Sequence, residues 1–87
     1  MRIWFKQWKD SRMVRDLVIE DNSDETRTHK VFGALDQACY DMDLGRPLWL
    51  DVTVRDFKRQ AKARFTKDCF MEEVWFDYLE IDVIEED

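Results

Sequence analysis

The stretch from Ser23 to Leu44 constrains the fold most, because its spacing predicts one long amphipathic helix. Asn22 or Ser23 is suited to cap the first turn, while Gly45 and Pro47 mark the end of the helix. Apolar residues recur every three or four positions along the stretch, which defines one buried face. They are Val31, Leu35, Ala38 and Met42, with Phe32 and Cys39 beside them.

Gly33 lies inside this predicted helix, where glycine costs roughly 1 kcal/mol relative to alanine. Two interpretations stay open. Gly33 is either a tolerated weak point or a place where another backbone approaches closely.

The chain before the helix predicts a β-hairpin. Ile3 to Trp8 and Arg12 to Glu20 are rich in β-branched and aromatic residues, and only residues 9–11 separate them. Side chains alternate between the two faces of a strand. In the first strand, Ile3, Phe5 and Gln7 therefore share one face, and Trp4, Lys6 and Trp8 share the other.

The chain after the helix predicts a short helix and a closing strand. The short helix spans Val54 to Phe65, and the strand spans Val74 to Ile84. The resulting order, ββααβ, predicts a single α+β domain over residues 1–87. It contains a small three-stranded antiparallel sheet, with the long and the short helix packed on one face.

A sheet covered on one face leaves its other face exposed, and the predicted strands place aromatic side chains on both faces. Aromatic residues carry much of the energy of protein contacts, and exposed apolar patches mark such contacts. The candidate contact residues are Trp4, Trp8, Phe76 and Tyr78. We therefore expect a non-enzymatic binding or assembly module, either a homodimer or a subunit of a protein complex.

The charges are segregated along a chain whose net charge is −6. Residues 72–87 hold eight acidic groups and no basic one, whereas residues 55–67 hold six basic groups and one acidic group. We expect the basic helix and the acidic strand to be neighbours and partly to neutralise each other. The alternative is a nucleic-acid-related regulator, acting through the basic helix 54–65 or through the acidic C-terminal strand as a mimic or docking surface. The candidate basic stripe is Arg55, Lys58, Arg59 and Lys62, although the negative net charge disfavours nucleic acid as a partner.

No catalytic or ligand-binding signature stands out in the sequence. His29 and Cys39 are ten residues apart, which is about 15 Å along a helix axis, so they cannot form a catalytic dyad. No zinc-ligand spacing occurs, and Asp41, Asp43 and Gly45 match a calcium loop only in part. We expect no enzyme activity, no cofactor and no metal.

The cysteines and the hydropathy indicate a compartment. Cys39 and Cys69 are too few for a disulfide framework, and the apolar face around Cys39 is typical of a reduced core cysteine. No segment reaches the roughly 18 apolar residues of a membrane span, and residues 1–9 do not match a signal peptide. The sequence predicts a cytoplasmic protein without a membrane segment.

Five segments resemble a group of short uncharacterised proteins from anaerobic Gram-positive gut bacteria. They are Ser23–His29 (SDETRTH), Trp49–Asp51 (WLD), Phe57–Arg59 (FKR), Phe76–Ile81 (FDYLEI) and Val83–Asp87 (VIEED). The similarity covers essentially the whole chain and implies a bacterial cytoplasmic housekeeping or accessory protein. It transfers no activity and no functional residue to this chain.

Overall fold

The computed structural model describes residues 1–87 and contains two α-helices and a four-stranded antiparallel sheet. This confirms the α+β class. In chain order the elements are β1 (Arg2–Lys9), β2 (Arg12–Glu20), α1 (Arg27–Asp41), α2 (Asp51–Gln60), β3 (Lys62–Thr66), a 3-10 turn (Lys67–Cys69) and β4 (Tyr78–Glu85).

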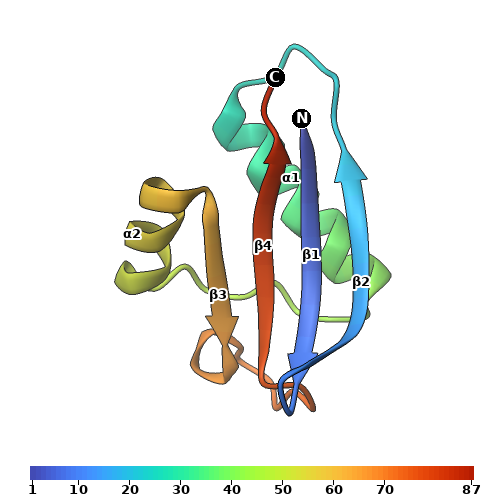
Figure 1. Cartoon of the computed structure of the whole chain (residues 1–87), viewed down its shortest axis with the longest axis vertical. Helices are drawn as coiled ribbons and strands as arrows, with labels where there is room; N and C mark the ends of the chain where they lie inside the picture. Colours follow the sequence, from blue (N-terminus) through green and yellow to red (C-terminus); the bar gives the residue numbers. More distant parts are fainter.

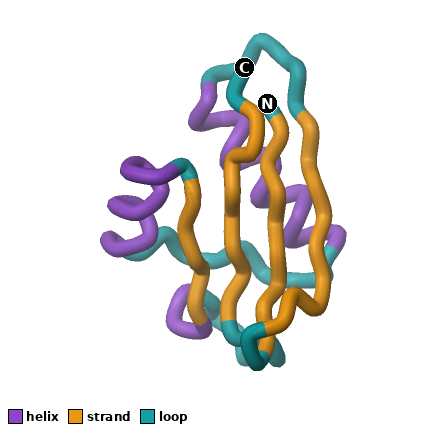
Figure 2. The backbone as a smooth tube through the Cα atoms, in the orientation of Figure 1, coloured by secondary structure: helices purple, strands orange, loops and turns teal.

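The strands lie side by side in the order β2-β1-β4-β3 (Figure 1). The hairpin between β1 and β2 turns through Asp10 and Ser11, whose φ angles of 52° and 65° are those of a tight turn that matches the twist of the strands. The first and last strands therefore form the centre of the sheet, and β2 and β3 form its two edges. Figure 2 shows the four strands as one layer, with both helices outside it.

The fourth strand corrects the prediction of three. Residues 54–65 do not form one helix, because α2 ends at Gln60 and Ala61 adopts a left-handed conformation with φ 55°. The chain then reverses into β3, where Ala63 and Phe65 are buried and their neighbours are exposed. This alternation is that of a strand with one buried face. The chain order is therefore ββααββ.

Other boundaries also differ from the prediction, since α2 begins at Asp51 rather than Val54 and α1 ends at Asp41 rather than Leu44. The long helix begins at Arg27, and its cap is Thr26, whose side chain accepts a hydrogen bond from the backbone N–H of His29. The preceding loop is held by its own side chains instead, since Asp21 accepts a hydrogen bond from the Ser23 backbone N–H at 2.9 Å. The closing strand begins at Tyr78, four residues later than predicted.

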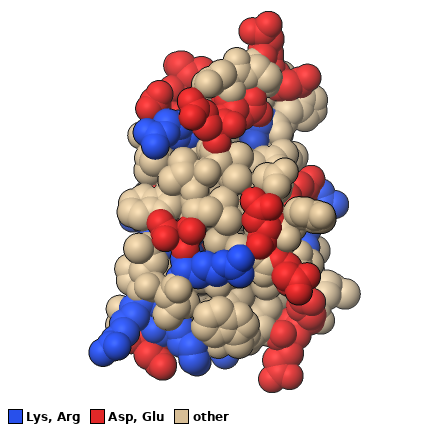
Figure 3. Space-filling model, turned by 90° about the vertical axis from the view of Figure 1, so that its right-hand side faces the viewer, with Lys and Arg blue, Asp and Glu red and all other residues tan.

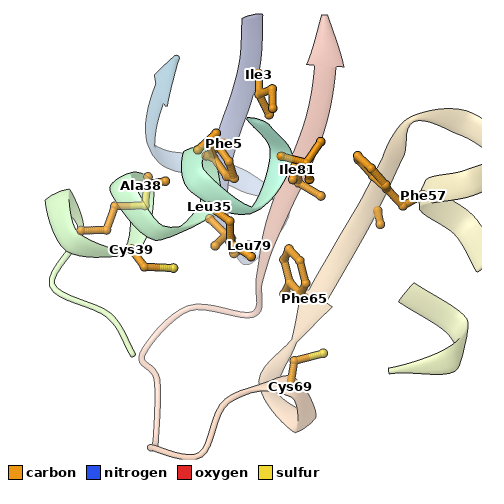
Figure 4. Packing of buried hydrophobic residues seen from close by; sticks show 14 of the residues in the cluster. Ile3, Phe5, Leu35, Ala38, Cys39, Phe57, Phe65, Cys69, Leu79 and Ile81 are labelled. Carbon is orange, nitrogen blue, oxygen red and sulfur yellow. The ribbon is translucent and has the colours of Figure 1, made fainter. Parts of the chain in front are cut away.

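The core lies between α1 and one face of the sheet (Figure 4). The predicted stripe of the long helix is confirmed, because Val31, Leu35 and Ala38 are all buried. They pack against the face of β1 that carries Ile3 and Phe5 and against the matching residues of β4. The fully buried side chains of these two strands include Ile3, Phe5, Leu79 and Ile81.

The second helix lies alongside the edge strand β3 and contributes to the same core through Phe57 (Figure 1). Trp49, in the segment before α2, contacts both α2 and β3. Its ring meets those of Phe57 and Phe65 edge to face, with centroids 5.4 and 4.8 Å apart. Both helices therefore contribute to a core on one side of the sheet, and neither lies on the opposite face.

Candidate functional site

The face of the sheet without helices, named here the open face, carries alternating aromatic and charged side chains. In the register of the two central strands, Trp4 lies opposite Asp82, and Trp8 lies opposite Tyr78. Lys6 and Glu80 form the pair between them. The edge strands add further side chains to the same face, which are Asp16 and Val18 from β2 and Lys62 and Arg64 from β3.

Glu80 is the centre of a polar network on this face. Its Oε1 accepts a hydrogen bond from Trp8 Nε1 at 3.0 Å, and its Oε2 lies 3.3 Å from Lys62 Nζ. The ammonium group of Lys6 is 3.6 Å away. Burial alone raises the pKa of Glu80, but the hydrogen bonds from Trp8 and Lys62 and the charge of Lys6 outweigh it, so this pKa lies below its ordinary value. Glu80 therefore stays ionised at neutral pH.

The aromatic rings are fixed in the same way. Trp4 Nε1 donates to Asp16 Oδ2 at 2.8 Å, and the ammonium group of Lys6 lies 3.9 Å from the centre of the Trp4 ring. Trp8 stacks against Tyr78, with ring centroids 6.3 Å apart. Trp4, Trp8 and Tyr78 are each half-buried. Their ring positions are thus set before any partner arrives, which lowers the entropy cost of a contact.

Phe76 does not belong to this face, so its assignment as a contact residue is wrong. It precedes β4, is fully buried, and packs edge to face against Phe70 with centroids 5.6 Å apart. The alternation of a strand cannot be extended back to it, because residues 74–77 lie outside β4. The aromatic residue that the loop exposes is its neighbour Trp75.

The candidate basic stripe is also divided. Arg55, Lys58 and Arg59 are exposed on α2, but Lys62 belongs to β3 and is paired with Glu80 on the open face. Lys58 and Arg59 have no acidic partner within 4 Å, and Arg55 has only its neighbour Asp56, at 3.7 Å. The helix α2 therefore forms no ion pair with the acidic strand, whereas β3 of the same basic segment lies beside β4 and pairs with it through Lys62 and Glu80. The expected partial neutralisation is thus confined to β3.

Five of the eight acidic groups in residues 72–87 form ion pairs, mostly with cations outside the basic segment 55–67. Arg27 of α1 holds Glu86 through two hydrogen bonds of 3.0 Å, and these lower the pKa of Glu86 and raise that of Arg27. Lys30 lies 2.6 Å from Asp87. The remaining pairs join Arg2 to Glu85, the N-terminal amine to Asp87, Lys6 to Asp82 and Glu80, and Lys62 to Glu80. This pairing disfavours the segment as a nucleic-acid mimic.

An apolar groove lies between α1 and α2, and the sequence analysis missed it. Its volume is about 280 Å³, and Phe32, Trp49 and Phe57 line it together with Val31 and Val54. Arg27, Thr28 and Lys58 complete its wall. In the sequence these residues look like ordinary core or surface residues. Only the packing of the two helices brings them together around a groove.

His29 and Cys39, the two residues considered for a catalytic pair, lie on α1 and not on the open face. His29 is exposed on the first turn of α1, with Nδ1 3.1 Å from Glu25 Oε2. Cys39 is buried, and burial raises the pKa of its thiol to about 11. No cluster of three or more His, Cys, Asp or Glu side chains has the arrangement of a metal site. No helix has both the length and the apolar character needed to cross a membrane.

Comparison with protein-family models, with curated proteins and with solved structures gives no match.

Proposed function

We propose that this chain is a non-enzymatic protein-binding module whose contact surface is the open face of its sheet. One observation carries the proposal: Trp4, Trp8 and Tyr78 lie half-buried on a face without helices, where hydrogen bonds to carboxylates hold the two tryptophans, and Trp8 and Arg64 pack against Tyr78. Rigid aromatic residues with satisfied polar atoms are typical anchors of protein interfaces. The surrounding acidic and basic side chains provide the polar rim that such an interface has.

A capture experiment tests this proposal. The tagged protein is incubated with nuclease-treated cell lysate, and bound proteins are identified by mass spectrometry. Two variants alter the open face: Trp4→Ala removes an anchor, and Val18→Glu adds a charge next to it, where Val18 is 41% exposed. Trp75→Ala is the matched control, because Trp75 is 57% exposed but lies in the loop before β4.

The expected result is a set of proteins that the wild type and Trp75→Ala retain and that both open-face variants lose. Circular dichroism of each variant checks that the fold is intact. Equal capture by all four proteins would contradict the proposal.

The second candidate is binding of nucleic acid through α2, which the unpaired cations Lys58 and Arg59 favour. A gel-shift assay with generic DNA and RNA at low salt separates it from the first candidate. Binding that falls steeply as salt rises, and that Lys58→Glu abolishes, would support it. The division of the stripe and the net charge of −6 make this candidate the weaker one.

A further inference from the structure

The outward face of α1 carries two exposed aromatic side chains on either side of a notch. Phe32 is 45% exposed and Tyr40 is 82% exposed. Between them lies Gly33, where an added Cβ would meet no atom within 4 Å. No part of the chain therefore makes the close approach that the sequence analysis considered for Gly33, and the notch is open to another molecule.

The apolar groove lies beside one end of this face. Phe32 and Thr28 of α1 form one wall of the groove, and Lys58 of α2 forms part of the other. Tyr40 lies at the opposite end, two turns further along the helix. One surface thus holds a concave apolar site near the start of α1 and a protruding aromatic side chain near its end.

Two charges on this surface that have no ion pair, those of Lys58 and Asp43, are of opposite sign. Lys58, at the groove, has no acidic side chain within 4 Å, and Asp43, just beyond the end of α1, has no basic one. Asp36, near the middle of the helix, is already paired with Arg46 at 3.1 Å. Acidic side chains line the side of the molecule that carries α1 (Figure 3), so the attraction to a second copy rests on the cation Lys58 at the groove. The surface thus has a groove and the cation Lys58 at one end, and the protruding Tyr40 and the anion Asp43 at the other. Such a surface is complementary to a second copy of itself when the two copies are antiparallel.

We propose that two copies of this chain associate through α1, with the two helices antiparallel about a two-fold axis between Gly33 and Asp36. Residue spacing then sets the contacts. Tyr40 of one copy comes level with His29 of the other, beside the groove, and Asp43 comes level with the first turn of α1, near Lys58. Gly33 lies opposite Asp36 of the second copy, where the missing side chain leaves room for the helices to meet.

Every contact in such a dimer occurs twice, so a single substitution alters two places in the interface. This surface lies on the side of the sheet away from Trp4 and Trp8. The inference is therefore independent of the binding function proposed for the open face, and each can fail without the other.

Sedimentation equilibrium tests the dimer by a charge exchange. The wild type is measured from about 1 μM to about 1 mM, the range in which small interfaces dissociate. Asp43→Lys and Lys58→Glu each place like charges together, and each is expected to raise the dimer dissociation constant roughly tenfold. The double variant restores opposite charges and is expected to return to the wild-type value.

The controls are Asp68→Lys and Lys67→Glu, which change the net charge equally at exposed residues without ion pairs in the 3-10 turn after β3, and which are expected to leave the dissociation constant unchanged. Tyr40→Ala is expected to weaken the dimer, whereas Trp8→Ala is not. A wild type that stays monomeric at every concentration overturns the inference. So does a dimer that Trp8→Ala disrupts and that the two charge reversals leave intact, because its contact lies on the sheet.

Discussion

The indole nitrogen of Trp8 donates a 3.0 Å hydrogen bond to Glu80, the one buried acidic residue of the chain. The two side chains come from neighbouring central strands, and the bond joins an aromatic ring of the open face to a carboxylate that also holds Lys6 and Lys62. The face is thus rigid because one carboxylate of β4 anchors residues from both neighbouring strands, β1 and β3. Its stability should follow the ionisation of Glu80.

Replacing Glu80 by glutamine tests this dependence on pH. The pKa of Glu80 lies below its ordinary value of 4.5 in the folded chain, so its contribution to stability is present above that value and is lost as the pH falls through the folded pKa. Glu80→Gln is expected to cost about 2 kcal/mol at neutral pH, because buried Lys6 loses a partner. Urea denaturation between about pH 7 and about pH 3 should then show a shallower acid decline than in the wild type. Glu73→Gln, at an exposed residue without an ion pair, serves as the control, and an unchanged decline in Glu80→Gln would contradict the assignment.

Replacing Ala61 by glycine should stabilise the fold. Ala61 ends α2 with φ 55°, a conformation that costs an L-residue with a Cβ roughly 1 kcal/mol and costs glycine little. We expect the free energy of unfolding to rise by about 0.5–1 kcal/mol, as measured by chemical denaturation. Ala63→Gly, two residues later in β3, should lower it instead, since a strand interior disfavours glycine. A loss of stability in Ala61→Gly would show that the methyl group makes a contact worth more than the strain.

Replacing Gln7 by methionine should also stabilise the fold. Gln7 is 1% exposed on the core side of β1, and neither its amide nitrogen nor its amide oxygen has a hydrogen-bond partner. An unpaired buried amide costs free energy that an apolar side chain of similar shape avoids. The expected gain is about 1–2 kcal/mol by thermal or chemical denaturation. Gln37→Met, at an exposed residue of α1, should stay within about 0.5 kcal/mol of the wild type. A lower stability of Gln7→Met would contradict this, because it would mean that the amide of Gln7 makes a stabilising hydrogen bond.

The two thiols should be inert in the folded protein. Cys39 and Cys69 are 3% and 1% exposed, and the pKa of Cys39 is raised to about 11. Because the thiolate is the reactive form, Ellman's reagent at mildly alkaline pH should modify neither residue until urea unfolds the chain. Cys69→Ser assigns any residual reactivity to one of the two. Fast modification in native buffer would indicate an opening of the α1 side of the core.

The sequence predicts those parts of the fold whose local pattern and tertiary packing agree. The alternation in β1 places Trp4 and Trp8 opposite Phe5, and the helical spacing of Val31, Leu35 and Ala38 identifies the buried face of α1. In both elements one periodicity runs through the whole segment. Their assignment therefore needs no knowledge of the rest of the chain.

The edge strand β3 could not be predicted in the same way. Val54, Phe57, Ala61 and Phe65 keep helical spacing across the point where the helix ends. The residue that turns the chain there is alanine, whereas a left-handed cap is usually marked by glycine. The tertiary contacts that favour the strand are the pairing of β3 with β4 and the packing of Phe65 against Trp49. The groove between α1 and α2 escaped prediction for a related reason, since its walls come from segments that are distant in the sequence.

The placement of both helices on one side of the sheet has a consequence for the dimer inferred above. Two copies joined through α1 would stand back to back, and their sets of Trp4, Trp8 and Tyr78 would point in opposite directions. Such a particle is bivalent: it cannot close both binding faces around one small target, but it can bridge two. Weak single contacts would then gain in avidity on any target that presents its sites in repeated copies.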